Sequence, residues 1–204
     1  MLYLANPCTP RVLDAMRDGH LGYIDTPAQG NRRPAGVVWA ADNGCFGKGY
    51  PGDAAWLEWL ANMDPAGCLF ATAPDVVGDA AATLTRSAPF LSHIRALGYP
   101  AALVAQDGLE DLTIPWDEFD VLFVGGSTEW KLGPAARSIV AQAKALGKHV
   151  HMGRVNSERR YRYALAIGCG SCDGTYLTFG PDLNLPDVLA WSRLATHPIL
   201  EVTA

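Results

Sequence analysis

The sequence contains no uninterrupted apolar run of the roughly 20 residues that a membrane-spanning helix requires. We therefore expect no membrane span and no membrane partner. The first residues, MLYLANPCTPRVLDAM, also lack the basic and apolar segments of a secretory signal peptide. The five cysteines are an odd number in a chain long enough to fold without crosslinks, which indicates reduced thiols and a cytoplasmic protein rather than a disulfide framework.

An excess of positive charge is absent as well. The 16 lysines and arginines are outnumbered by 21 aspartates and glutamates, which gives a net charge of −5. Binding to nucleic acid through overall charge is therefore not expected. A local basic cluster remains, and its members are Arg154, Arg159, Arg160 and Arg162. Such a run is also typical of a solvated helix face, and the sequence leaves both interpretations open.

What the sequence does contain is the composition of one globular domain. Its 204 residues are 49% hydrophobic and 18% charged, so we expect a single domain spanning residues 1–204. Short apolar runs that end in Gly, Asp, Asn or Pro predict buried strands. Eight such runs are present: Leu2–Ala5, Gly22–Asp25, Val37–Ala41, Cys68–Ala73, Ala101–Gln106, Val121–Val124, His149–Met152 and Ser171–Tyr176.

Helical patterns lie between most of these strands. They are Asp53–Met63, Ala80–Leu97, Pro134–Leu146, Ser157–Ile167 and Pro186–Leu194. The alternation predicts an α/β fold, specifically a compact (β/α)8 TIM-like barrel. The chain is short for that fold, so some helices must be abbreviated, and the stretch between Ile24 and Val37 is expected to be a loop with no helix. The alternative is an open doubly wound sheet with fewer strands.

Polar residues and glycines follow the ends of six predicted strands. In barrels and open α/β sheets alike, ligands bind at the carboxyl ends of the strands. Each motif alone is typical of a turn, and Asp79 is typical of a helix cap. Their shared position favours one functional site over six unrelated turns. The motifs are Asp42-Asn43-Gly44-Cys45-Phe46, Asp75-Val76-Val77-Gly78-Asp79, Gln106-Asp107-Gly108, Gly125-Gly126-Ser127, Gly153-Arg154-Val155-Asn156 and Asp173-Gly174-Thr175.

The groups in these motifs suit a guanine-like base. A carboxylate accepts hydrogen bonds from the N1–H group and the exocyclic amine of guanine, while an amide and the N–H groups of a glycine pair reach O6 or N7. A second carboxylate is then available to attack an anomeric carbon, and a third to transfer protons. This is the logic of retaining glycosyl transfer with paired carboxylates.

The order of the motifs resembles the tRNA-guanine transglycosylase superfamily, and especially its phage and bacterial deazaguanine DNA transglycosylases. The similarity covers roughly Val38 to Thr175. Asp42-Asn43-Gly44-Cys45-Phe46 resembles the family's Asp-Ser-Gly-Gly-Phe, and Gln106 resembles the glutamine of its Val-Gln-Gly-Gly motif. The remaining matches are Asp75 to a base-recognising aspartate, Gly125-Gly126 to a glycine pair, His151-Met152-Gly153-Arg154 to a Met-Gly strand, and Asp173 to the nucleophile.

The resemblance implies an enzyme that replaces guanine in DNA with a 7-deazaguanine derivative, such as a preQ0-like base, through a covalent aspartyl-sugar intermediate. Asp173 would be the nucleophile, and Asp42 would assist proton transfer or orient the sugar and base. The partners would be DNA and the free guanine or 7-deazaguanine base, in the host cytoplasm if the gene is carried by a phage, with the oligomeric state left open. Substrate contacts are expected from Asp75, Gln106, Gly125, Gly126, Asn43 and Phe46, and phosphate contacts from Arg154, Arg159, Arg160 and Lys131.

One departure from the family concerns metal. The tRNA enzymes carry a zinc-binding insertion with three cysteines and a histidine, whereas this chain has only Cys169-x-x-Cys172. We therefore expect a barrel without the zinc-binding insertion, with no metal and no cofactor. The missing insertion also removes part of the surface that docks tRNA, which favours DNA or a small substrate.

Three alternatives remain open at this stage. His149-x-His151 places two imidazoles on one face of a strand, as in metal-dependent barrel hydrolases, although only His20, His93 and His197 remain to complete such a site. The base pocket is also compatible with a hydrolase acting on a free nucleoside. A purine-binding or DNA-binding module without enzymatic activity is the third alternative.

Overall fold

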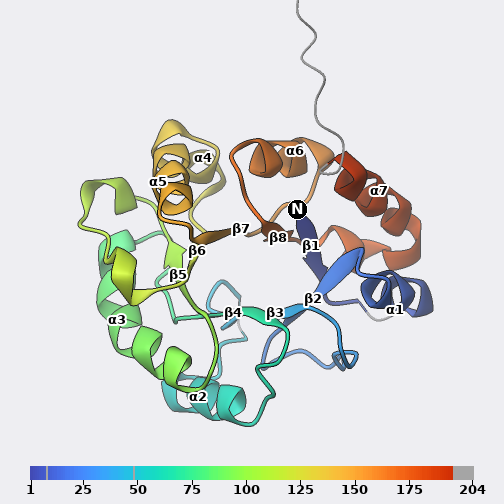
Figure 1. Cartoon of the computed structure of the whole chain (residues 1–204), viewed down its shortest axis with the longest axis horizontal. Coiled ribbons are helices and arrows are strands. Elements are labelled where there is room, and N and C mark those ends of the chain that lie inside the picture. The colour runs from blue at the N-terminus through green and yellow to red at the C-terminus, as the bar shows by residue number, and fades with distance from the viewer. Residues whose placement is uncertain (8, 48, 195–204) are drawn as a thin grey trace, which may run out of the picture.

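The computed structural model describes residues 1–7, 9–47 and 49–194, and its central feature is a closed parallel β-barrel. Neighbouring strands pair in chain order, and β8 pairs with β1 to close the ring, as Figure 1 shows. This closure confirms the predicted (β/α)8 barrel and excludes the open sheet. The strands are β1 (Leu2–Ala5), β2 (Leu21–Asp25), β3 (Trp39–Ala41), β4 (Cys68–Thr72), β5 (Ala101–Ala105), β6 (Val121–Val124), β7 (His149–Met152) and β8 (Ser171–Asp173).

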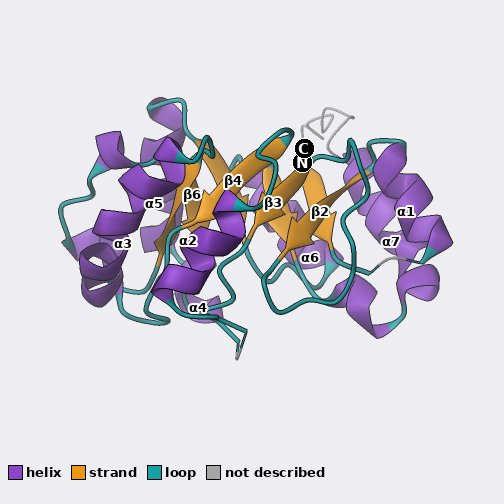
Figure 2. Cartoon of the chain, turned by 90° about the horizontal axis from the view of Figure 1, so that it is seen from below, coloured by secondary structure: helices purple, strands orange, loops and turns teal. Residues whose placement is uncertain are grey.

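Helices surround the barrel unevenly, which explains how a short chain completes it (Figure 2). Residues 26–38 connect β2 to β3 without a helix, as predicted, and two short 3-10 helices connect β5 to β6. These 3-10 helices are η1 (Leu109–Asp111) and η2 (Trp116–Glu118), and a third, η3 (Tyr176–Phe179), follows β8. The α-helices are α1 (Pro10–Arg17), α2 (Asp53–Ala61), α3 (Ala80–Ala96), α4 (Thr128–Lys131), α5 (Pro134–Ala145), α6 (Glu158–Ala166) and α7 (Pro181–Leu194).

The structure differs from the predicted elements in several element bounds and in helices that were not predicted, which include α4 and the three 3-10 helices. Helix α1 was not predicted, although Thr9 at its N-cap and Pro10 at its first position are a common helix start. Helix α7 begins at Pro181, so Pro186 lies inside the helix rather than at its start. Strand β8 ends at Asp173 rather than continuing to residue 176, because the next residues turn away into η3.

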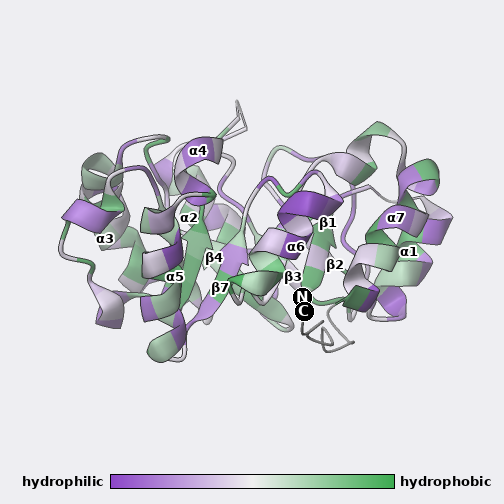
Figure 3. Cartoon of the chain, turned by 90° about the horizontal axis from the view of Figure 1, so that it is seen from above, coloured by the Kyte–Doolittle hydropathy of each residue, from purple (hydrophilic) through white to green (hydrophobic). Residues whose placement is uncertain are grey.

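Side chains alternate along each strand between the inside and the outside of the barrel. The outward side chains pack under the helices in the main core, and the strands are mostly green in the hydropathy view of Figure 3. The inward side chains form a second core that includes Leu4, Ile24, Phe70 and Phe123. Within the described residues, no helix combines the length and hydrophobicity needed to cross a membrane.

Candidate active site

A cavity of about 340 Å³ opens at the carboxyl ends of the strands. It brings together residues from the ends of all eight strands, and they include every substrate-binding and catalytic residue named from the sequence. Those residues are Asp42, Asn43, Phe46, Asp75, Gln106, Gly125, Gly126 and Asp173, and Arg154 also lines the cavity. A larger hollow of about 1000 Å³ lies beside the helix-free loop between β2 and β3, and it contains none of these residues.

One wall of the cavity is built from Asp75 and two amides. Gln106 donates from Nε2 to Asp75 Oδ2 at 2.7 Å, and Asn43 donates from Nδ2 to Asp75 Oδ1 at 3.2 Å. The Gln106 Oε1 atom accepts from the backbone N–H groups of Gly78 and Gly126 at 3.0 and 3.1 Å. These bonds fix which end of the amide faces Asp75. Burial raises the pKa of Asp75, and the two amide hydrogen bonds oppose that rise.

The glycine pair is needed for this wall to form. A Cβ atom at Gly125 would lie 2.7 Å from the Val104 side chain and 3.2 Å from Gln106 Nε2. At Gly126 a Cβ atom would collide with the ring of Trp130, and its φ of +41° also disfavours a side chain. Larger residues at either position would therefore displace Gln106 or the segment that follows.

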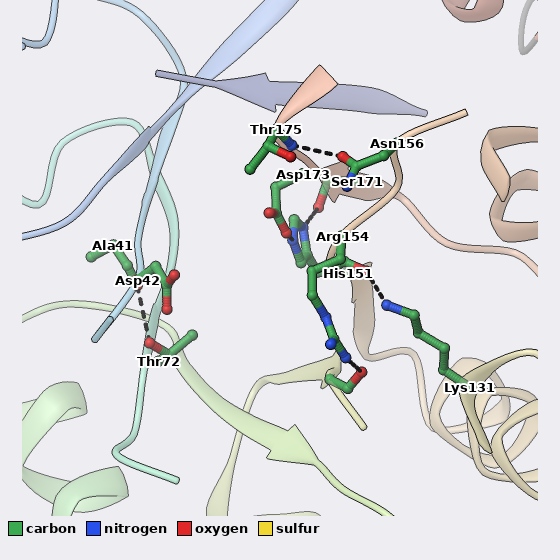
Figure 4. Close-up of polar contacts among 12 residues, drawn as sticks. Ala41, Asp42, Thr72, Lys131, His151, Arg154, Asn156, Ser171, Asp173 and Thr175 are labelled. Atoms are coloured by element: carbon green, nitrogen blue, oxygen red, sulfur yellow. Dashed lines mark hydrogen bonds and ion pairs between the residues drawn. The ribbon is translucent and has the colours of Figure 1, made fainter. Parts of the chain in front are cut away.

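Asp42 and Asp173 lie on opposite sides of the cavity, at the ends of β3 and β8 (Figure 4). Burial raises the pKa of Asp42 to about 7, and the negative charge of Asp173 adds to the rise. A carboxyl group with such a pKa exchanges protons readily at neutral pH. Two carboxyl groups in one cavity, one of them in a buried environment that raises its pKa, are an arrangement that acid–base glycosyl chemistry uses.

Asp173 has a partner that the sequence argument did not assign to it. His151 Nε2 lies 2.9 Å from Asp173 Oδ1, and the imidazole is fully buried inside the barrel. The sequence had raised His151 only as part of the Met-Gly strand and of a possible metal site. The signal for its role was its inward position on β7, next to β8, since both strands direct alternate residues into the barrel.

Two carboxylates near the strand ends support loops rather than line the cavity. Asp79 accepts from the backbone N–H group of Ala82 and caps α3, as its position predicted. Asp107 accepts from the backbone N–H and the hydroxyl of Ser127, at 2.6 and 2.5 Å. Ser127 is the N-cap of α4, so Asp107 fixes the start of that helix.

The prediction that Lys131 contacts a phosphate requires correction. Its side chain is 1% exposed, and Nζ donates to the backbone carbonyl of Gly153 at 2.6 Å. Burial, reinforced by repulsion from Arg154, lowers the pKa of Lys131 to about 7. Lys131 therefore supports the backbone beneath the cavity and does not face a nucleic acid.

Arg154 is held inside the cavity wall. It has a φ of +61°, the only positive φ among the described non-glycine residues. Its Nη2 group donates to the carbonyls of Gly125 and Gly126, and its Cζ atom lies 4.3 Å from the centre of the Phe46 ring. Arg160 donates from Nη1 to the Arg154 carbonyl at 3.3 Å. Two members of the predicted basic cluster are thus committed at least in part to building the rim.

The other two arginines lie on the exposed side of α6. Arg162 pairs with Glu158, with 2.7 Å between Nη2 and Oε1, whereas Arg159 is an exposed residue in the first turn of the helix. Of the four residues proposed to bind phosphates, Arg159 is therefore the one exposed to solvent. Arg162 is therefore a residue of the solvated helix face, paired with Glu158 on the same helix.

The described residues contain no group of three or more histidine, cysteine, aspartate or glutamate side chains arranged to hold a metal ion. His149 and His151 both contact Ser171 Oγ, at 2.7 and 2.8 Å, instead of converging on an open position. His93 is an exposed helix residue that contacts the Pro89 carbonyl, and His197 lies outside the described residues. Cys172 is a fully buried strand residue, as predicted.

No protein-family model matches this sequence, and no curated protein matches it. Among solved structures, a chain from the crystal structure of the Amycolatopsis orientalis BexX/CysO complex is similar, with 14% sequence identity and a TM-score of 0.40. The alignment covers 98% of this chain and 79% of that chain. At this identity and TM-score the similarity bears on neither activity nor partners.

Proposed function

We propose that this protein exchanges bases in DNA, replacing guanine with a 7-deazaguanine derivative through a covalent bond between Asp173 and the sugar. The observation that carries the proposal is the content of one cavity. It holds a buried carboxylate with two oriented amides, a carboxyl group with a pKa near 7, and a separate carboxylate fixed by a histidine. Base recognition, proton transfer and nucleophilic attack each have a group within this space.

The wall formed by Asp75, Gln106 and Asn43 is suited to the edge of a guanine base. A carboxylate has about four acceptor positions, and the two amides use two of them. The others are available to the N1–H group and the exocyclic amine of guanine. The Gln106 carbonyl oxygen already accepts two backbone hydrogen bonds. The second N–H of the amide is therefore the group available to a ligand, and it can donate to O6 of guanine.

The proposed reaction has two displacements. In the first, an Asp173 oxygen bonds to C1′, the C1′–N9 bond breaks with its electron pair going to the base, and Asp42 donates a proton to the leaving guanine. In the second, N9 of the incoming base attacks C1′ while Asp42 accepts the N9 proton and the bond to Asp173 breaks. Asp42 ends in its starting protonation state, and two inversions restore the configuration of the sugar.

A base inside a duplex cannot enter this cavity without leaving its stack. Flipping a nucleotide out costs a few kcal/mol, and enzymes offset the cost with stacking and phosphate contacts. Phe46 is 62% exposed at the cavity rim, with one face covered by Arg154, and its other face is a candidate stacking surface. Arg154 uses only Nη2 in its bonds to the two carbonyls, so its Nε and Nη1 groups are candidates for binding a phosphate. Arg159 is the candidate for binding a more distant phosphate.

Hydrolysis of a free nucleoside in the same cavity is the second candidate function. The specific observation in its favour is the small number of exposed basic residues near the rim, since Lys131 is buried and Arg160 contacts the backbone. The same Asp173 and Asp42 would then serve with water in place of the incoming base. Release of labelled guanine from DNA beyond one equivalent per protein only when a preQ0-like base is supplied distinguishes exchange on DNA from this alternative.

Replacing Asp75 is expected to weaken base binding. Asp75→Ala removes the buried acceptor for the guanine N–H donors, and an unpaired buried donor costs about 1–3 kcal/mol. Calorimetric titration with free guanine should therefore show weaker binding by roughly tenfold to 100-fold, with a smaller loss for Gln106→Ala because its hydrogen bonds are neutral. Asp79→Ala is the matched control, since Asp79 follows in the same loop but caps α3. Wild-type guanine affinity in Asp75→Ala would place the base elsewhere.

Replacing Arg159 is expected to change the salt dependence of DNA binding. Arg159→Ala should lower the magnitude of the slope of log K against log salt by about 0.9 for duplex DNA, as loss of one phosphate contact does. Free-base binding should be unchanged, because Arg159 does not line the cavity. Arg162→Ala is the matched control on the same helix, since Arg162 pairs with Glu158. Identical slopes for all three proteins would assign Arg159 to the solvated face and favour the nucleoside hydrolase.

A further inference from the structure

We propose that His151 is a positioning residue for Asp173 and connects it to a hydrogen-bonded chain that runs into the barrel and ends at His149. The inference rests on the proposed function, in which Asp173 is the nucleophile. The chain has four members on two neighbouring strands. Asp173 Oδ1 lies 2.9 Å from His151 Nε2, His151 Nδ1 lies 2.8 Å from Ser171 Oγ, and Ser171 Oγ lies 2.7 Å from His149 Nε2. Figure 4 shows His151 and Ser171 next to Asp173.

The barrel interior holds the imidazole of His151 in one place. Its ring is 0% exposed and packs against two aromatic rings, with centroid distances of 4.8 Å to Phe70 and 4.6 Å to Phe123. His149, at the far end of the hydrogen-bonded chain, packs closely over Gly170, where a Cβ atom would lie 2.6 Å from His149 Cε1. The chain therefore sits on rigid elements, which is what accurate placement of a reacting group requires.

The direction of the hydrogen bonds follows from the role of Asp173 as the nucleophile, which requires its carboxylate form. An ionised carboxylate only accepts, so His151 Nε2 must carry the proton that it directs at Oδ1. If the imidazole is neutral, the Ser171 hydroxyl donates to Nδ1 and accepts from His149. If the imidazole is charged, Nδ1 donates to Ser171, and the hydroxyl donates to His149. The chain is continuous in both states, and burial lowers the pKa of His149 to about 4, which leaves that ring neutral at pH 7.

The hydrogen bond from His151 determines which oxygen of Asp173 attacks C1′. Oδ1 is occupied by His151, so Oδ2 is left for C1′, and the carboxylate cannot rotate without breaking its bond to the imidazole. Gly153 leaves room for the Phe123 ring that packs against His151, since a Cβ atom there would lie 2.8 Å from Phe123 Cε1. Misplacement of a reacting group by about 1 Å can lower a rate by about 100-fold.

The kinetic test separates positioning from binding. His151→Leu should slow single-turnover guanine release from DNA by about 100-fold while leaving the Kd for free guanine within about twofold, because His151 does not line the cavity. His151→Gln should restore most of the rate, since its side-chain N–H can replace the donor to Asp173. A folded His151→Leu protein that releases guanine at the wild-type rate would overturn the proposal, as would a His151→Gln protein no better than His151→Leu.

Two further measurements test the proposal even if His151→Leu does not fold or the protein does not exchange bases. Ser171→Ala changes little volume, and it should slow guanine release while keeping the guanine Kd; an unchanged rate would contradict the chain. Independently of activity, ¹⁵N-imidazole NMR of the wild type should show a slowly exchanging proton on His151 Nε2, with faster exchange in Asp173→Ala. Absence of that proton, or equal exchange in the variant, would overturn the pairing itself. Absence of base exchange with the proton present would instead refute only the proposed function.

Discussion

Asp173→Asn is expected to keep the fold and to lose guanine release by about 10³-fold or more, since removal of a nucleophile abolishes the covalent route. The asparagine is nearly isosteric, and its carbonyl oxygen can still accept from His151 Nε2, so the hydrogen bond beneath the site is retained. What is lost is the negative charge and the nucleophilic oxygen at the Oδ2 position. The covalent adduct with DNA should disappear together with guanine release.

The measurement for Asp173→Asn is denaturing electrophoresis of protein mixed with labelled DNA, combined with the release of labelled guanine. Asp18→Asn is the matched control, because Asp18 is an exposed carboxylate at the end of α1 and far from the cavity lining. Thermal unfolding of both variants checks that the fold is intact. An adduct or exchange rate equal to wild type in Asp173→Asn would remove this residue from the role of nucleophile.

Asp42→Asn has the second largest expected effect. Loss of a positioned general acid–base group lowers rates by about 10²–10⁴-fold, and the asparagine cannot exchange a proton with the base. The pKa of about 7 also predicts a pH profile for the wild type, because the first step needs protonated Asp42. Single-turnover guanine release should fall as the pH rises above about 7. Asp42→Asn should be slow throughout and lack this decline, and a variant that keeps the decline would assign it to another group.

The same pKa shift gives a stability prediction with a definite sign. Asp42 loses its proton near 3.8 when unfolded and near 7 when folded, so between these values the folded protein binds more protons. Its contribution to stability is therefore full at low pH and is lost as the pH rises through about 7. Asp42→Asn should gain stability relative to wild type between pH 4 and pH 7, as measured by urea unfolding.

The sequence was sufficient to predict the barrel and several of the residues that line the cavity. Strands buried on both faces are nearly continuous apolar runs, and they end where polar groups can reach solvent. One example is β6, whose apolar run Val121–Val124 predicts the strand and whose following Gly125-Gly126 pair predicts its end. Closure of the sheet then brings residues as distant in sequence as Asp42 and Asp173 to the same cavity.

Two side chains show what the sequence could not predict. Lys131 follows Trp130 in a polar segment and was expected to be exposed, but α4 packs over the rim and buries the ammonium against the Gly153 carbonyl. His151 could be placed inside the barrel, but its pairing with Asp173 depends on the register between β7 and β8. Burial and strand register are consequences of tertiary packing that local patterns do not specify.

The most direct test of the account is base exchange on DNA. Purified protein is incubated with duplex DNA carrying labelled guanine, with and without a free preQ0-like base, and both the released label and the base composition of the DNA are measured. Beyond one equivalent per protein, we predict release of guanine that depends on the added base, with one 7-deazaguanine incorporated for each guanine lost and neither event in Asp173→Asn. Intact label in the DNA under all of these conditions, or release of guanine that leaves abasic sites regardless of the added base, would contradict the proposed exchange.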